Sequence, residues 1–287
     1  MLAVFNKELK SYFTSAAGYI FMGIFLLISG IFFVLVNLVQ GNSEYNLVLE
    51  DITFIFLLLV PILTMKILSE EKKNKTDQLL LTSQVSVWDI VMGKFLAACT
   101  LFLVTLCITG IYPLILKIYG TIAGGEILCS YIGFFLMGCA FISIGVFVSS
   151  LTENQMISAA LSFCILLMLW ISDWIKQSIS STLRSGLIFS IIIAALITLA
   201  VYYAVKNIYV TFFTGAAGAL IIGIIYFTNK NLYEGFIVKF LGWLSLLSRY
   251  DEFVNGILSF NSAIYYVSFA FVFLFLTTRM IEKRRWS

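Results

Sequence analysis

Long apolar runs dominate the chain, and the short segments between them carry most of its charged residues. Inside a bilayer core about 30 Å thick, backbone groups must hydrogen-bond within their own segment, so a spanning helix needs roughly 17–25 apolar residues. Eight runs reach or approach that length: Ala17–Val39, Ile52–Leu68, Phe95–Leu116, Ile127–Ser149, Met156–Ser172, Leu187–Val205, Ile208–Thr228 and Ala263–Thr278. The pattern predicts an all-α polytopic membrane protein with about eight transmembrane helices, forming one membrane domain over residues 1–287.

Two of these runs, within residues 187–228, are separated by Lys206 and Asn207 alone. They fit either two full spans joined by a tight turn or one re-entrant pair, and both choices leave the direction of every other span unchanged. The segment 229–262 that follows is rich in aromatic residues but has charges throughout. We expect it to form interfacial or re-entrant helices on the outer face.

Composition narrows the class of protein. Hydrophobic residues make up 61% of the 287 residues and charged residues only 11%, against about 25% charged residues in soluble domains. This balance excludes a soluble enzyme, a disordered protein and a coiled coil.

The absence of histidine removes histidine-based acid–base chemistry and histidine metal sites. The five cysteines lie in or beside apolar runs without C-x-x-C spacing, so we interpret them as small apolar residues. We expect no catalytic residue, cofactor or metal site, and the net charge of +3 gives no indication of nucleic-acid binding.

Lysine and arginine residues favour one side of the predicted arrangement. With a cytoplasmic N-terminus, 12 of the 18 face the cytoplasm and the other six face outward. The cytoplasmic set is Lys7, Lys10, Lys66, Lys72, Lys73, Lys75, Lys94, Lys206, Arg279, Lys283, Arg284 and Arg285. Because cytoplasmic loops are enriched in these residues, we predict that both termini lie inside. Lys66 is the one charged residue within the predicted spans, which weighs against an ion-coupled transporter.

Three segments on the predicted inner side are candidates for a functional role. Residues 1–16 have apolar side chains at helical spacing and predict an interfacial helix, although an ordinary juxtamembrane segment also fits. The loop 69–90 combines a charge cluster, expected at a water-exposed helix end, with Leu79, Leu80 and Leu81. Such exposed leucines indicate either a docking partner or a segment that dips into the interface. The third segment is the short loop 149–155.

The first of these loops resembles a known signature. Its residues Ser69, Glu70, Glu71, Lys72, Thr76, Leu79, Leu80, Leu81 and Thr82, followed by Gly93 and Lys94, are similar to the inner-loop motif of ABC-2 type transporter permeases. Lys75, Gln78 and Gln84 depart from the glycine, glutamate and proline of that motif. The C-terminal Arg249, Tyr250, Asp251, Glu252, Phe253 and Gly256, together with Tyr265 and Tyr266, resemble the gliding-motility-type branch of the family. The opening with Lys7, Glu8 and Leu9 is similar to the family's interfacial elbow helix.

The resemblance implies a permease subunit in the cell membrane, with a six-span core and residues 187–228 as an extra helical pair. It implies two partners besides the lipid bilayer: a separate cytoplasmic ABC ATPase and a second permease chain. It assigns ATPase coupling to the segments 69–90 and 149–155, with the candidate residues Glu70, Glu71, Lys72, Thr76, Leu79, Leu80, Leu81, Glu153 and Asn154. Transport, in most such permeases export, then takes its energy from the partner. The chain itself has no phosphate-binding loop, since Trp88 and Phe95 flank Gly93 and Lys94 where glycine and serine or threonine are required.

Two other hypotheses belong to different classes. A membrane scaffold that anchors or regulates a cytoplasmic partner would bind that partner without transporting a substrate. A membrane-embedded enzyme is disfavoured, because the sequence has no histidine and no arrangement of acids or nucleophiles typical of a catalytic site.

Overall fold

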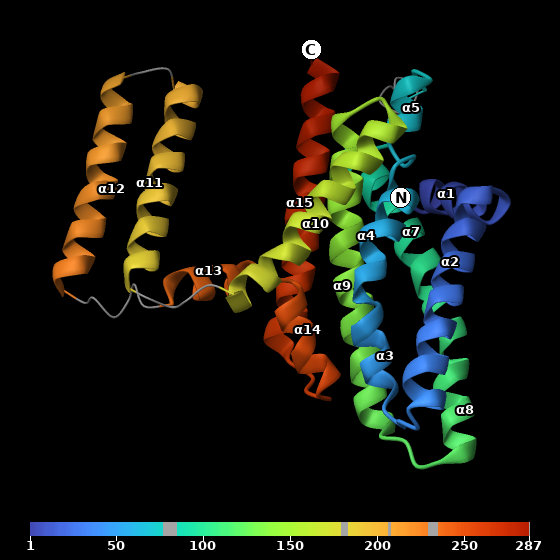
Figure 1. Ribbon diagram of the computed structural model, residues 1–287. Coiled ribbons are helices and arrows are strands. Elements are labelled where there is room, and N and C mark those ends of the chain that lie inside the picture. Colours follow the sequence, from blue (N-terminus) through green and yellow to red (C-terminus); the bar gives the residue numbers. More distant parts are fainter. Residues whose placement is uncertain (77–84, 179–182, 206–207, 229–234, 287) are drawn as a thin grey trace. The chain divides into compact units, whose positions relative to one another are not determined.

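The computed structural model describes residues 1–76, 85–178, 183–205, 208–228 and 235–286, and every regular element in these ranges is a helix (Figure 1). The elements are α1 (Leu2–Thr14), α2 (Ala16–Phe32), η1 (Phe33–Val39), α3 (Tyr45–Asp51), η2 (Ile52–Phe54), α4 (Ile55–Thr64), α5 (Ser69–Lys73), α7 (Val87–Thr109), α8 (Ile111–Tyr119), α9 (Gly124–Leu151), α10 (Gln155–Ser178), α11 (Leu183–Val205), α12 (Ile208–Thr228), α13 (Phe236–Leu244), α14 (Leu247–Val254) and α15 (Phe260–Trp286).

Six helical stretches in the described ranges are long and apolar enough to cross a bilayer. They are Ala16–Val39, Tyr45–Lys73, Val87–Tyr119, Gly124–Leu151, Gln155–Lys176 and Phe260–Lys283. The prediction of an all-α polytopic membrane protein is therefore confirmed. The number of spans beyond these six and the orientation remain predictions.

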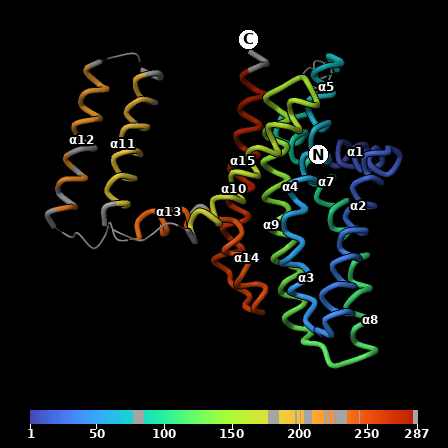
Figure 2. Tube along the Cα trace, in the orientation of Figure 1, coloured from blue at the N-terminus to red at the C-terminus, as the bar shows by residue number. Residues whose placement is uncertain are grey.

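The helices divide into two compact units, one formed by Met1–Trp170 with Leu246–Ser287 and the other by Ile171–Ser245. In the first unit α9 is the central element, and α3, α4, α7, α14 and α15 all pack against it. The tube in Figure 2 traces the same arrangement, with the C-terminal helix α15 beside α9 although more than one hundred residues separate them in sequence.

Small side chains allow the neighbouring helices to approach α9 closely. A Cβ atom at Gly145 would collide with the side chain of Thr64 on α4, and one at Gly133 would lie 2.5 Å from Cβ of Phe253 on α14. Helices in membranes associate mainly through such close packing, because lipid tails are as apolar as the side chains themselves. The small residues of α9 therefore determine how near its partners lie.

The helix α14 packs on α9 and α3 of the first unit through its aromatic residues. Tyr250 and Phe253 are 1% and 0% exposed. The Ser130 hydroxyl of α9 donates to the Phe253 carbonyl (3.1 Å), and the Asn46 amide of α3 donates to the Val254 carbonyl (2.9 Å). Thus the described part of the segment predicted as interfacial or re-entrant contains two short helices, α13 and α14, and the second is hydrogen-bonded to the bundle.

Residues of the C-terminal motif also join α14 to α15. The Arg249 guanidinium lies 3.8 Å from the centre of the Tyr265 ring, a cation–π contact. The Ser262 hydroxyl donates to the Glu252 carboxylate (2.6 Å), and this hydrogen bond lowers the pKa of Glu252 below its ordinary value. In this structure, these motif residues fix the position of one helix on another.

In the second unit, α11 and α12 lie side by side and occupy both apolar runs of residues 187–228, as either sequence interpretation requires. A mostly apolar groove of about 870 Å³ runs between them, lined among others by Leu187, Thr198 and Gly215. Near the end of α10, the Ser245 hydroxyl lies 2.6 Å and 2.8 Å from the two carboxylate oxygens of Asp173.

Close packing at α9 leads to a test of the fold. We expect Gly145→Ala to lower the midpoint of thermal unfolding, at a cost of about 1–3 kcal/mol, because the added methyl group has no space beside Thr64. Gly23→Ala is the matched control: a Cβ atom there meets nothing within 4 Å, and alanine in a helix is favoured over glycine by about 0.5–1 kcal/mol. The unfolding midpoints of both variants in detergent provide the measurement. Equal effects of the two substitutions would contradict the packing role of Gly145.

Candidate functional site

Of the residues predicted for ATPase coupling, those that the structure describes lie at one end of the first unit (Figure 1). Those on α5 and the turn after it are Glu70, Glu71, Lys72 and Thr76. Those in the turn between α9 and α10 are Glu153 and Asn154. The remaining three, Leu79, Leu80 and Leu81, lie outside the described residues.

The end of α9 holds the start of α5 through side-chain and backbone hydrogen bonds. The hydroxyl of Ser149, which is fully buried, accepts from the backbone N–H groups of Leu68 and Ser69, both at 3.1 Å. The first N–H groups of a helix lack partners within the helix, so a fixed hydroxyl at this point stabilises α5. In return, the Lys72 ammonium donates to the Ser150 carbonyl. The two predicted coupling segments are therefore bonded to each other.

The expected exposure of the charge cluster holds only in part. Lys73 is exposed and Glu70 is half-buried, but the Glu71 side chain is 15% exposed and Lys72 is 9% exposed. The expectation of a water-exposed cluster was wrong for Glu71 and Lys72, because Glu71 faces Lys94 and Lys72 turns toward the end of α9. A buried ammonium needs an acceptor, and the Ser150 carbonyl provides one.

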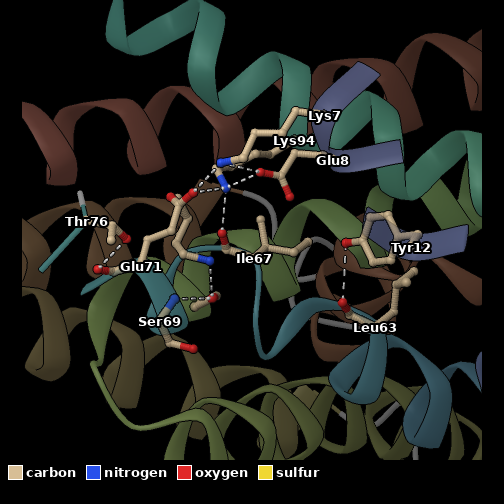
Figure 3. Close-up of polar contacts among 11 residues, drawn as sticks. Lys7, Glu8, Tyr12, Leu63, Ile67, Ser69, Glu71, Thr76 and Lys94 are labelled. Carbon is tan, nitrogen blue, oxygen red and sulfur yellow. Dashed lines mark hydrogen bonds and ion pairs between the residues drawn. The ribbon is translucent and has the colours of Figure 1, made fainter. Parts of the chain in front are cut away.

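A second buried ammonium, that of Lys94, joins three elements (Figure 3). Lys94 on α7 is 2% exposed, and its Nζ lies 2.9 Å from Oε1 of Glu8 on α1 and 2.8 Å from Oε1 of Glu71 on α5. The Ile67 carbonyl, in the turn before α5, accepts from the same nitrogen at 3.0 Å. The Nζ atom of Lys7 lies 3.8 Å from Oε1 of Glu8 and 3.8 Å from Oε1 of Glu71. We call Lys7, Glu8, Glu71 and Lys94 the Lys94 cluster.

Sequence reasoning missed this cluster. It placed Lys94 on the predicted inner side, one residue before a span predicted to begin at Phe95. The predicted start was wrong, because α7 begins at Val87, so Lys94 lies within the helix and faces other protein; the side of the membrane on which it lies remains a prediction. Two signals were available: the Gly93-Lys94 pair that closes the inner-loop motif, and Glu8 in the middle of an otherwise cationic and apolar helix.

Glycine at position 93 allows α1 to lie directly on α7. A Cβ atom there would be 3.2 Å from the Met1 carbonyl oxygen, 3.2 Å from the Phe5 nitrogen and 3.1 Å from Cβ of Val4. Any side chain at residue 93 would press on the backbone of α1. The same close approach brings Glu8 within hydrogen-bond distance of Lys94.

The turn between α9 and α10 is ordered by its own side chains. The Asn154 carbonyl oxygen of the side chain accepts from the N–H of Met156 (2.9 Å), which makes Asn154 the N-cap of α10. The Thr152 hydroxyl accepts from the N–H of Asn154 (3.0 Å). Of the two residues predicted here, Asn154 thus has a structural role, while Glu153 is exposed. Within the described ranges, no group of three or more histidine, cysteine, aspartate or glutamate residues has the geometry to hold a metal ion.

The sequence of the chain matches a known protein family. A family model described as ABC-2 family transporter protein matches residues 37–229, about two-thirds of the chain. The chain belongs to this family. The resemblance seen in the sequence is thereby confirmed at the level of the family, and the protein is a transmembrane permease of an ABC transporter. No curated protein sequence is significantly similar to the chain.

The matched range differs from the one on which the sequence resemblance rested. It includes α11 and α12, which were expected to be an insertion, and it ends before the C-terminal motif. The gliding-motility-type branch therefore remains a prediction.

The position of Lys75, where the ABC-2 motif has glycine, has a backbone conformation that favours glycine. Lys75 has a φ of 57°, the left-handed conformation that glycine adopts most easily. Its N–H donates to the Lys72 carbonyl (3.1 Å), and the N–H of Thr76 donates to the Glu71 carbonyl (3.0 Å), which together form a Schellman motif that ends α5. The glycine of the ABC-2 motif matches the conformation found here, although this chain has lysine.

This conformation predicts a stabilising substitution. Lys75→Gly removes the steric cost of a left-handed lysine, about 1–2 kcal/mol, while the added chain entropy of the unfolded state offsets about half of it. We expect a small net gain in the free energy of unfolding and slower hydrogen exchange at the amides of α5. Lys73→Gly is the control, because Lys73 is helical, so glycine there should destabilise by about 1 kcal/mol. A lower stability for Lys75→Gly would show that the left-handed conformation is not strained.

Proposed function

We propose that this permease subunit is driven by a separate cytoplasmic ABC ATPase that docks on α5 and on the turn of residues 152–154. The observation that supports the proposal most directly is the bonding of α5 to the end of α9, which leads into that turn, through Ser149 and Lys72. The bonded residues lie about 80 positions apart in the sequence, and we propose that α5 and the turn form one docking surface. A partner that moves this surface therefore acts on α5 and α9 together.

The charge distribution of the surface suits a protein partner. Glu70 and Lys73 are at least partly exposed, whereas Lys72 and Lys94 are buried and paired within the chain. Exposed charges of both signs provide electrostatic complementarity, which selects a partner and its orientation. The buried pairs keep the docking surface attached to the membrane helices.

The remaining parts of the proposal follow the ABC-2 family. We propose a permease dimer, with a second copy or a related chain, in the cell membrane. We propose export as the direction of transport, because the permeases that this chain resembles mostly export. ATP binding would close two ATPase subunits, and the docking surface would pass that movement to the spans.

Purification of the tagged permease from its native membrane tests the proposal. We expect an ABC ATPase to co-purify, and the reconstituted complex to hydrolyse ATP faster than the ATPase alone. Glu70→Lys should weaken docking and reduce this stimulation about tenfold, which corresponds to about 1.4 kcal/mol. Glu70 suits the test because its side chain is not part of the Lys94 cluster.

The matched control is Glu44→Lys, the same charge reversal at an exposed residue that precedes α3. The helix α3, whose first turn follows Glu44, lies toward the other end of the first unit from α5 (Figure 1), so stimulation should remain at the wild-type level. If no ATPase co-purifies, the proposal is wrong. If the ATPase binds but is not stimulated and no substrate accumulates across the membrane, the chain is a membrane scaffold instead.

A further inference from the structure

The Lys94 ammonium uses all of its hydrogen-bonding capacity on three separate parts of the chain. An ammonium group has three N–H donors, and the three acceptors within 3.0 Å of Nζ are Glu8, Glu71 and the Ile67 carbonyl. Glu8 belongs to α1, Glu71 to α5, and Ile67 to the turn that links α4 to α5. One buried atom therefore contacts the elbow helix, the docking surface and the second span at once.

The charges of the Lys94 cluster are balanced. The carboxylates of Glu8 and Glu71 face the ammonium groups of Lys94 and Lys7, with Lys7 at 3.8 Å from each carboxylate. Both carboxylates are mostly shielded, at 16% and 15% exposure. Removing one partner of such a pair leaves an uncompensated charge in a poorly hydrated position, so the contacts are strongly maintained.

The helix α1 is attached to its neighbours by contacts of different kinds. It packs on α7 at Gly93, where backbone and side-chain atoms approach closely. Its link to α5 is ionic and centres on Glu71, which lies 2.8 Å from the Lys94 ammonium that also binds Glu8, and 3.8 Å from the ammonium of Lys7 on α1 itself. The Tyr12 hydroxyl adds a long hydrogen bond to the Leu63 carbonyl on α4 (3.5 Å), which does not involve α5.

From these contacts we infer that the Lys94 cluster makes the elbow helix α1 follow the movement of α5. The inference rests on the proposed function, in which nucleotide binding by the ATPase displaces α5. The displacement passes from Glu71 to Lys94 and on to α7 and, through Glu8, to α1, and it also passes from Glu71 directly to Lys7 of α1. The elbow helix, which is predicted to lie in the membrane interface, then changes its position with each ATPase cycle.

Hydrogen–deuterium exchange of the whole permease–ATPase complex in nanodiscs tests this role. Exchange is compared between the nucleotide-free state and the state trapped with ATP and vanadate, in peptides that cover residues 1–14 and 69–76. In the wild type we expect trapping to change the exchange of both segments. In Glu71→Gln we expect the change in 69–76 to persist and the change in 1–14 to be lost, because neutral glutamine does not hold the ammonium as strongly.

Two controls separate this role from a general loss of structure. Glu282→Gln removes a carboxylate from an exposed pair with Arg279 within α15, and it should leave both responses as in the wild type. Glu71→Asp keeps the charge but shortens the side chain, so it should reduce the response of 1–14 without changing the exchange of α9 in the nucleotide-free state. This second variant tests the link if Glu71→Gln yields too little folded complex.

The outcomes distinguish the inference from the proposed function. If segment 69–76 of the wild type does not respond to nucleotide, the docking proposal fails. If 69–76 responds but 1–14 does not, or if 1–14 responds equally in wild type, Glu71→Gln and Glu71→Asp, the role of the Lys94 cluster is overturned while ATPase docking stands. The inference is supported if trapping changes the exchange of residues 1–14 in the wild type and in Glu282→Gln, and if this change is lost in Glu71→Gln and reduced in Glu71→Asp.

Discussion

An ammonium group that water does not reach must be met by acceptors within the protein, and Lys94 meets this requirement with residues from three elements. The arrangement of this end of the bundle depends on it. The helix α1 must approach α7 closely enough for Glu8 to reach the ammonium, and glycine at position 93 leaves room for that approach, whereas a Cβ atom there would lie only 3.1–3.2 Å from atoms of α1 and Met1. The turn before α5 must direct the Ile67 carbonyl inward. The close approach of α1 to α7, the glycine at position 93 and the inward direction of the Ile67 carbonyl all serve to satisfy this one buried charge.

The other determinant is α9, whose small residues bring its neighbours close and whose serine hydroxyls bond to their backbones. Ser130 and Ser149 lie toward opposite ends of this helix, and each hydroxyl contacts a backbone group of another element. Membrane helices gain no hydrophobic free energy from packing against each other in lipid, so such contacts provide much of the specificity. The central helix therefore also organises the two regions where the family motifs lie.

Sequence reasoning succeeded where a property is local. The apolar runs predicted the helices, since length and composition alone decide whether a segment can cross a bilayer. The inner-loop motif indicated the family, and two of its residues, Glu71 and Lys72, join α5 to Lys94 and to the end of α9. The roles of Lys94 and Ser149 were missed, because both depend on contacts with residues roughly 80 positions away in the sequence. A hydropathy profile does not distinguish an exposed lysine in a loop from a buried lysine that pairs with a carboxylate far away in the sequence.

Because α9 is long and is hydrogen-bonded to other helices toward both ends, a tilt of α9 moves those helices relative to each other. Its 28 residues extend over about 42 Å, and Ser149 and Ser130 attach it to α5 and to α14. Between Ser149 and Ser130, about 28 Å apart along the helix axis, a tilt of about 5° produces a displacement of roughly 2.5 Å. Such a helix is a lever arm: a small rotation imposed beside α5 becomes a displacement of about that size at α14, with no rearrangement inside the helix itself.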